Sequence, residues 1–409
     1  MPVEADDRDV AAVVAANTTL AFDLFQLVRS ESGATNPVLG VHSISTAMTI
    51  ALGGARGQTA AELRDVLGHT LDDATLHRSV AALDHSLRAR QGGSTDLALA
   101  NRVWLQDDLM VVDSFDALVR DVYDAGPTLL DFRTGASGAV DDANRWADQQ
   151  TSGRIPHILG EFGGMDRLRW LLLNATYFNA QWAHPFDPAN TNPRPFDLVG
   201  ATITVEMMAA NFDAAYASGS GWRSVRLPYF DGGLSMVVVV PDELDAFVAG
   251  LDVAVWSTVL PGPLGPGAVA ERVEMPAFSA RWTGDLVPAF EKLGVRDAFG
   301  CDADFSGVFE FDLGMDEGDT NIGFVQHEAF IDVDEKGTEA AAVTAVGGFQ
   351  KVSRSLDEPE PIIFRADRPF LYAIVDDLTG AILFLGEVTD PRVEAAAPSL
   401  PTIAPRLCG

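Results

Sequence analysis

The stretch FIDVDEKGTEAAAVTAVGGFQKVSRS, residues 330–355, decides how this chain of 409 residues is interpreted. It begins with the alternating pattern of a β-strand and continues, from Ala340 to Gln350, without any charged side chain. On one face of an extended strand, every second residue from Thr338 to Gly348 is threonine, alanine, valine or glycine. Such a face has nothing bulky or ionic to bury, so the segment can enter a sheet between existing strands.

The residues that follow this uncharged segment suit proteolysis. Outside a sheet, the segment would be an exposed loop that is open to proteases. Lys351 and Arg354 come directly after it, and a trypsin-like specificity pocket accepts both kinds of side chain. A flexible alanine-rich linker that is cut adventitiously would have the same composition, so the segment alone leaves both interpretations open.

The rest of the chain favours one large α+β domain. Helical patterns dominate the first third and strand patterns the remainder. No Pro/Gly/Ser linker divides the chain, so we expect a single domain over 9–391, with an N-terminal extension (1–8) and a Pro/Ala-rich C-terminal tail (392–409). The patterns predict helices over 9–29, 43–51, 58–67, 75–88, 113–124, 141–150 and 284–293, and strands over 97–105, 170–178, 203–208, 224–228, 234–240, 323–333, 369–375 and 381–388.

Charge restricts the possible partners of the chain. The 59 acidic and 28 basic residues give a formal net charge of -31. Such a surface repels nucleic acid and anionic membranes, so we expect neither as a partner. It attracts cationic proteins, as many proteases are, although adaptation to a salty or GC-rich source explains the acidity as well. No stretch reaches the ~18 uninterrupted apolar residues of a membrane span.

The cysteines and the N-terminus bear on where the protein works. Cys301 and Cys408 are too few for a disulfide framework, and Cys408, in the tail, is a candidate free thiol. Residues 1–10 lack the charged-then-apolar profile of a signal peptide. We therefore expect a cytoplasmic monomer, with secretion as the alternative if a leader precedes this sequence.

Motifs of catalysis and cofactor binding are missing from the sequence. There is no G-x-S-x-G, Walker A, G-x-G-x-x-G, H-E-x-x-H or C-x-x-C, and the seven histidines are scattered. The acidic loop with Asp312, Asp316, Glu317 and Asp319 lacks the glycine and the terminal glutamate of an EF-hand, which favours a solvated loop. We expect no enzyme, no cofactor and no metal, although a hydrolase with a site dispersed along the sequence remains an alternative.

Further motifs resemble, in order along the chain, those of one family. NRWADQQTSGRIPHIL (144–159) is similar to its N-x-W…T-x-G-x-I pattern, LLLNATYFNAQWAHPFD (171–187) to N-A-x-Y-F…W…F, and RPFLYAIVDDLTGAILFLGEVTDP (368–391) to its C-terminal hairpin. With the uncharged segment, which resembles the hinge of a reactive-centre loop, they make the chain similar to the serpins, serine protease inhibitors. The resemblance implies one α+β domain of about nine helices around three β-sheets, with an exposed reactive-centre loop.

The resemblance also implies a mechanical, single-use inhibition. A target serine protease attacks the loop and forms a covalent acyl-enzyme through its own serine. The cleaved loop then inserts into the main sheet as a new strand, a switch established for serpins. The sixteen residues from Lys336 to a cut after Lys351 would span roughly 50 Å, which drags the protease and distorts its active site. The uncut state must then be held by a kinetic barrier.

Residue roles in the loop follow from the same resemblance. Family spacing from Glu335 places the scissile bond at Lys351–Val352, with Arg354–Ser355 as the rival. Three more residues of tether would add ~10 Å of slack and weaken the distortion, which favours Lys351. The hinge comprises Glu335, Gly337, Thr338, Glu339, Ala340, Ala341, Ala342, Val343 and Thr344.

Other residues are expected to lie where the strands of the main sheet separate and to hold them together before cleavage. Glu335 is expected beside Trp182, and its usual lysine partner aligns with Ala277, so we expect that ion pair to be missing. A polar cluster beneath the opening strands is expected from Asn174, His327 and Ser43, with Gly40 in place of a further serine.

A non-inhibitory relative, acting as carrier, chaperone or structural protein, is the main alternative. Such relatives tend to have bulky or charged hinge residues, whereas residues 340–342 are three alanines.

Overall fold

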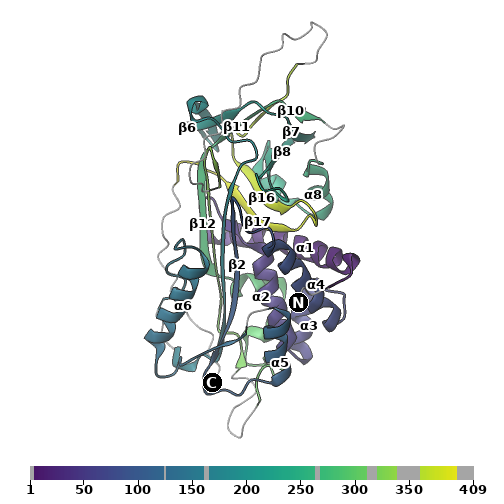
Figure 1. The fold of residues 1–409 in the computed structure, drawn as a ribbon, viewed down its shortest axis with the longest axis vertical. Coiled ribbons are helices and arrows are strands. Elements are labelled where there is room, and N and C mark those ends of the chain that lie inside the picture. Colours follow the sequence, from purple (N-terminus) through teal and green to yellow (C-terminus); the bar gives the residue numbers. More distant parts are fainter. Residues whose placement is uncertain are drawn as a thin grey trace.

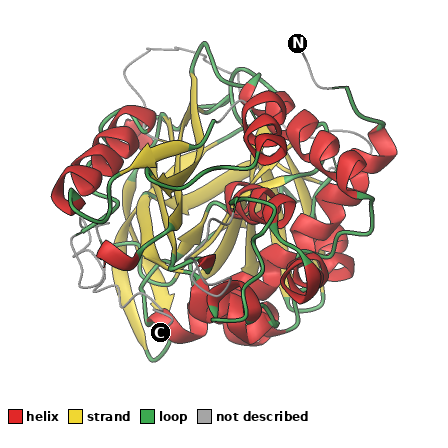
Figure 2. Ribbon diagram, turned by 90° about the horizontal axis from the view of Figure 1, so that it is seen from below, coloured by secondary structure: helices red, strands yellow, loops and turns green. Residues whose placement is uncertain are grey.

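The fold is a mixed α+β architecture in which helices surround three β-sheets (Figures 1 and 2). The computed structural model describes residues 4–123, 126–160, 165–262, 268–310, 320–338 and 360–393. Within these ranges lie nine α-helices and three sheets, so the expected fold class is confirmed. The helices are α1 (Asp7–Ser32), α2 (Val41–Gly54), α3 (Gly57–Val66), α4 (Asp73–Arg88), α5 (Asp113–Ala117), α6 (Ala136–Gln150), α7 (Leu244–Ala249), α8 (Val253–Val259) and α9 (Val287–Leu293).

The six-stranded sheet, here called the main sheet, has the order β12-β13-β14-β4-β2-β3. Its strands are β12 (Phe278–Asp285), β13 (Val325–Val333), β14 (Gly337–Thr338), β4 (Trp170–Gln181), β2 (Thr95–Gln106) and β3 (Thr128–Leu130). Strands β4 and β2 are 12 residues each, which is long for strands and lets them run the length of the molecule (Figure 1).

The two other sheets lie toward one end of the main sheet (Figure 1). The seven-stranded sheet has the order β1-β17-β16-β9-β8-β7-β10 and the four-stranded sheet the order β15-β11-β6-β5. Their strands are β1 (Val38–Leu39), β5 (Asn192–Leu198), β6 (Ala201–Ala210), β7 (Ala214–Gly219), β8 (Trp222–Pro228), β9 (Leu234–Pro241), β10 (Val269–Ala270), β11 (Arg272–Pro276), β15 (Ile363–Arg365), β16 (Phe370–Asp376) and β17 (Ile382–Val388).

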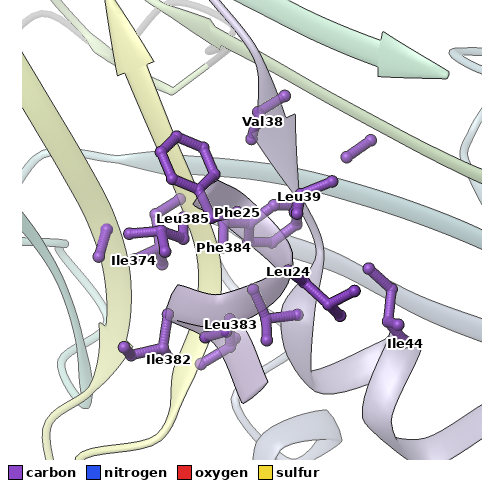
Figure 3. Close-up of a cluster of buried hydrophobic side chains, with 14 of the residues drawn as sticks. Leu24, Phe25, Val38, Leu39, Ile44, Ile374, Ile382, Leu383, Phe384 and Leu385 are labelled. Atoms are coloured by element: carbon purple, nitrogen blue, oxygen red, sulfur yellow. The ribbon is translucent and has the colours of Figure 1, made fainter. Parts of the chain in front are cut away.

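The main hydrophobic core lies where α1 and α2 pack against the closing hairpin β16–β17. Figure 3 shows Leu24 and Phe25 of α1 beside the side chains of residues 382–385 of β17, with Ile44 of α2 nearby. Almost every residue of α2 is buried, because the helix is enclosed by β17, β2 and β4. This enclosure fixes the N-terminus of α2 against the main sheet, where the candidate site lies.

A second, smaller core joins α6 to the other side of the main sheet. Figure 1 shows α6 and α2 on opposite sides of the long strands. Trp104 of β2 and Trp146 of α6 meet edge to face with ring centroids 6.0 Å apart, and the guanidinium of Arg102 lies within 6 Å of both rings. The part of the main sheet beneath α6, which includes Leu171, Leu173 and Ala175 of β4, is therefore covered on both faces, and a strand that entered the sheet there would be buried.

Two expected helices differ from the structure. The helix expected over 284–293 is wrong at its start, because β12 continues to Asp285 and α9 begins only at Val287. In β12 every second residue from Phe278 to Gly284 faces the core, and the Asp285 carboxylate then accepts the backbone N–H of Val287 at 3.1 Å. The helix expected over 113–124 is α-helical only to Ala117 and continues as a π-helical turn.

Two further observations concern the cysteines and α1. Cys301 is disulfide-bonded, which the sequence does not anticipate, and Cys408 lies outside the described residues. By length and composition, the segment Asp7–Glu31 is apolar enough to cross a membrane. A core helix has the same composition, and one face of α1 packs against β17 and α4.

Candidate functional site

The candidate site is the seam between β4 and β13 in the middle of the main sheet. These two strands are parallel and pair directly from Leu172 and Val325 to Tyr177 and Phe330. Beyond this ladder they no longer pair with each other, and the chain that leaves β13 turns back between them. The seam is thus closed along one part of its length and occupied at its end by another strand.

That other strand is β14, the first two residues of the predicted insertion segment. Thr338 pairs antiparallel with Val333 of β13 on one side and with Ala180 of β4 on the other. Continued in the same direction, β14 would replace one parallel pairing with two antiparallel ones. Antiparallel pairs are slightly more stable per residue than parallel pairs, and the number of paired strands would also rise.

The turn that leads into β14 is held by backbone contacts to Trp182. The indole N–H of Trp182 donates to the carbonyl of Asp334 at 3.0 Å, and its backbone N–H donates to the carbonyl of Lys336 at 2.9 Å. The carboxylate of Glu335 accepts the hydroxyl of Thr191 at 2.7 Å. None of the ion pairs among the described residues includes Glu335, in line with the alanine at the expected lysine position, Ala277.

Thr338 has an anchor that the sequence analysis missed. Its hydroxyl lies 2.8 Å from the hydroxyl of Tyr229, which is fully buried and stacked on Trp182 with ring centroids 4.7 Å apart. Burial raises the pKa of Tyr229, so this phenol stays protonated. Tyr229 follows β8 in the motif LPYFDGG, but no spacing along the sequence connects it with Thr338.

The closed part of the seam contains a buried hydrogen-bonded cluster. Nδ1 of His327 on β13 contacts Oδ1 of Asn174 on β4, and Nδ2 of Asn174 donates to Oδ1 of Asn101 on β2 at 2.5 Å. The backbone N–H of Gly40, just before α2, donates to Nε2 of His327 at 3.1 Å. Burial lowers the pKa of His327 to about 3, so the ring is neutral, and its single proton lies on Nδ1, toward Asn174.

Next to this cluster, β13 carries a buried ion pair with β12. Oε1 of Glu328 lies 2.6 Å from a guanidinium nitrogen of Arg281. Burial nevertheless raises the pKa of Glu328 to about 7, against the opposing effect of Arg281. The guanidinium of Arg281 also lies 4.4 Å from the ring centroid of Phe330, at the last pair of the ladder.

Comparison with known proteins assigns this arrangement to a family. The model of the family described as serpin (serine protease inhibitor) matches residues 15–391. The chain belongs to the serpin family. The fold implied by the sequence resemblance is therefore the fold observed.

Individual relatives of this serpin differ in what their names say they do. An uncharacterized serpin-like protein of Thermococcus kodakarensis is 30% identical over 382 residues, which cover 93% of this chain and 86% of the relative. The leukocyte elastase inhibitor of Bos taurus is 32% identical over 387 residues, covering 92% and 99%. The crystal structure of human thyroxine-binding globulin matches with a TM-score of 0.80 at 25% identity, over 94% of this chain and 99% of that one.

The structure brings together only some of the site residues predicted for this serpin. Trp182 lies at the start of the hinge, and Asn174 and His327 contact each other in the seam. Ser43 is buried in the first turn of α2, but its hydroxyl has no hydrogen-bond partner among the described atoms, so it does not join the cluster. The hinge from Glu339 to Thr344 and both candidate bonds, Lys351–Val352 and Arg354–Ser355, lie outside the described residues.

A metal site is not evident in the described part of this serpin. There, no group of three or more His, Cys, Asp or Glu side chains is arranged to hold a metal ion. The acidic loop at 312–319 lies outside those ranges.

Proposed function

We propose that this serpin is a single-use inhibitor of serine proteases that cleave after Lys or Arg. One observation carries the proposal: β14 already lies between β4 and β13 at one end of the seam, paired with both. The uncharged segment begins at Ala340, separated from β14 only by Glu339, so insertion would extend a strand that is already in the sheet. Inhibitory relatives such as the leukocyte elastase inhibitor support the same conclusion.

The proposed reaction begins as ordinary proteolysis. The serine Oγ of the protease attacks the carbonyl carbon of Lys351, and the bond to Val352 breaks. The amine of Val352 leaves with the proton that the protease histidine took from the serine. The chain itself serves as substrate and contributes no catalytic group.

Insertion then competes with hydrolysis of the acyl-enzyme. As β14 extends, the ladder from Leu172 to Tyr177 on β4 must separate from β13. An inserted strand of about sixteen residues spans roughly 50 Å and carries the bound protease with it. Both faces of the main sheet are covered beneath α6, so the small uncharged side chains that enter there become buried, which drives the step forward.

The proposal is tested by mixing the protein with trypsin. We expect a covalent complex that survives denaturing electrophoresis, and mass spectrometry should place the new C-terminus at Lys351. Trypsin whose active serine is chemically blocked is the control and should give no such complex. Complete turnover of the loop without any complex would contradict the proposal, and a cut after Arg354 would overturn the assignment of the bond.

A carrier function is the second candidate. A surface cavity of about 940 Å³ lies among α2, α3, α4 and α5, with Leu52, Phe115 and Leu118 on its walls. The solved structure of thyroxine-binding globulin complexed with its ligand has the same overall fold. A carrier would be cleaved by trypsin without forming a complex and without a gain in stability.

A further inference from the structure

We infer that Thr176 of β4 supplies the hydroxyl that holds the polar cluster of the seam together, and that residue 40 is glycine to leave room for it. The inference rests on the proposed function, because separation of β4 from β13 is the step that the cluster would restrain. It concerns a positioning residue, which acts through Asn174 and His327.

The first observation is the space around Gly40. A Cβ atom added there would lie 2.3 Å from Oγ1, 2.7 Å from Cβ and 2.8 Å from Cγ2 of Thr176. Backbone conformation does not explain the glycine, since Gly40 has φ -86°, which any residue tolerates. The threonine side chain therefore occupies the place that a side chain at position 40 would need.

The second observation is the hydrogen bonding of that threonine. Oγ1 of Thr176 lies 3.0 Å from Oδ1 of Asn174 and donates to it, and the same oxygen receives the Nδ1 proton of His327. Gly40 closes the ring, because its N–H donates to Nε2 of His327 while its Cα packs against Thr176. All four residues are buried, so each polar group depends on the others for its partner.

The ring spans the parts of the molecule that must move apart. Asn174 and Thr176 belong to β4, His327 to β13 and Gly40 to the start of α2. When β13 separates from β4, the contact between His327 and Asn174 breaks and leaves buried polar groups without partners, which is costly. By fixing the carboxamide of Asn174 toward β13, Thr176 raises the barrier that keeps the uncut protein from inserting its own loop.

A double-mutant cycle tests the ring in the uncut protein. The rate of unfolding in urea is the measurement, because a protein held by a barrier is described by a rate. Gly40→Ser alone clashes with Thr176, and Thr176→Gly alone loses the hydroxyl and leaves a gap. Glycine is used at position 176 because the Cβ of an alanine would remain 2.7 Å from a Cβ at position 40. Each should speed unfolding about tenfold or more, the equivalent of one buried hydrogen bond. In the double variant the serine hydroxyl takes the vacated place, so the rate should return to within about threefold of wild type.

A second comparison separates this restraint from a general loss of packing. After cleavage and insertion β4 and β13 are apart and the ring is broken, so Thr176→Val should change the unfolding rate of the cut form much less than that of the uncut form. Thr49→Val is the matched control, since Thr49 is equally buried and its hydroxyl donates within α2 to the carbonyl of Ser45 at 2.8 Å. That variant should affect both forms alike.

The outcomes distinguish the inference from the proposed function. If the double variant unfolds faster than wild type by the product of the two single-variant factors, the inference is overturned, whether or not the loop inserts after cleavage. If cleaved wild-type protein shows no gain in stability, the proposed function fails, while the cycle in the uncut protein still decides whether the ring exists.

Discussion

Gly337 occupies a position in the main sheet where no side chain fits. A Cβ atom there would lie 2.0 Å from the carbonyl oxygen of Ala180 and 2.7 Å from the Cα of Gln181. Both are backbone atoms of β4, so they cannot turn aside as a flexible side chain would. The close approach is what allows β14 to pair with β4 at the start of the hinge.

Replacing Gly337 with alanine should therefore push β14 away from β4. We expect the uncut protein to lose about 1–3 kcal/mol of stability, as proteins with overpacked sites do. We also expect trypsin to cleave more molecules of the variant as ordinary substrate for each covalent complex that forms. Urea unfolding and the stoichiometry of inhibition measure the two effects. Gly138→Ala is the control, because a Cβ at this position of α6 meets nothing within 4 Å. Equal behaviour of the two variants would show that the contact is unimportant.

Glu328 gives the seam a pH dependence of known sign. Its pKa is raised to about 7 in the folded protein, whereas an unburied glutamate titrates near 4.5. The folded protein thus holds this proton more tightly than the unfolded chain, and Glu328 makes the free energy of unfolding fall as the pH rises from about 4.5 to about 7. Glu328→Gln lacks this titration.

The comparison of wild type with Glu328→Gln isolates the effect from other titrating groups. We expect the stability of wild type relative to the variant to fall as the pH is raised through this window. Urea unfolding at matched pH values measures it. A relative stability that stays constant or rises with pH would contradict the raised pKa of Glu328.

At the scale of elements, the proposed inhibition depends on the extension of β14 into the seam. In a strand that continues β14, the side chain at position 342 would fall on the same face as Thr338, whose hydroxyl is buried against Tyr229. Arginine at that position would have to enter the sheet with a charge and no partner, at a cost of several kcal/mol. Ala342→Arg should therefore leave the loop cleavable but abolish the covalent complex with trypsin. Unaltered inhibition by this variant, read from complex yield on a denaturing gel, would refute insertion.

The helices and strands also show which elements sequence patterns predict and which they do not. Nearly continuous apolar runs such as residues 170–178, in which Asn174 and Thr176 are the polar exceptions, are predicted well, because a strand buried on both faces is mostly apolar. The early start expected for α9 comes from overlooking the alternation in β12, where every second residue is buried. Short helices such as α7 and α8 were missed, since six or seven residues give too little periodicity.

The candidate site was predictable only in part, for a related reason. Trp182 and Asn174 belong to the motif at 171–187, and the family resemblance indicates His327; the structure brings each of them to the seam. Gly40 and Thr176 are 136 positions apart in the sequence. Only the fold reveals that the side chain of Thr176 occupies the space that a side chain at position 40 would need. Ser43 shows the converse, because the family resemblance predicts its hydroxyl in a cluster that it does not reach.

At the scale of the whole molecule, the proposed mechanism requires a chain that is folded but has not reached its most stable arrangement. In the uncut protein β4 and β13 share a parallel ladder, although a strand that could pair with both is attached at the end of the seam. In the proposed mechanism, cleavage frees that strand to move. The gain comes from two antiparallel ladders and from burial of the inserted side chains, so it should amount to many kcal/mol.

The melting temperature before and after a single cut in the loop tests this central claim most directly. A domain of this size gains about 2 °C for each kcal/mol, so insertion should raise the melting temperature by about 10 °C or more. Ala342→Arg, cut at the same bond, should show a much smaller rise. A cut wild-type protein that melts at the temperature of the uncut one would contradict the account.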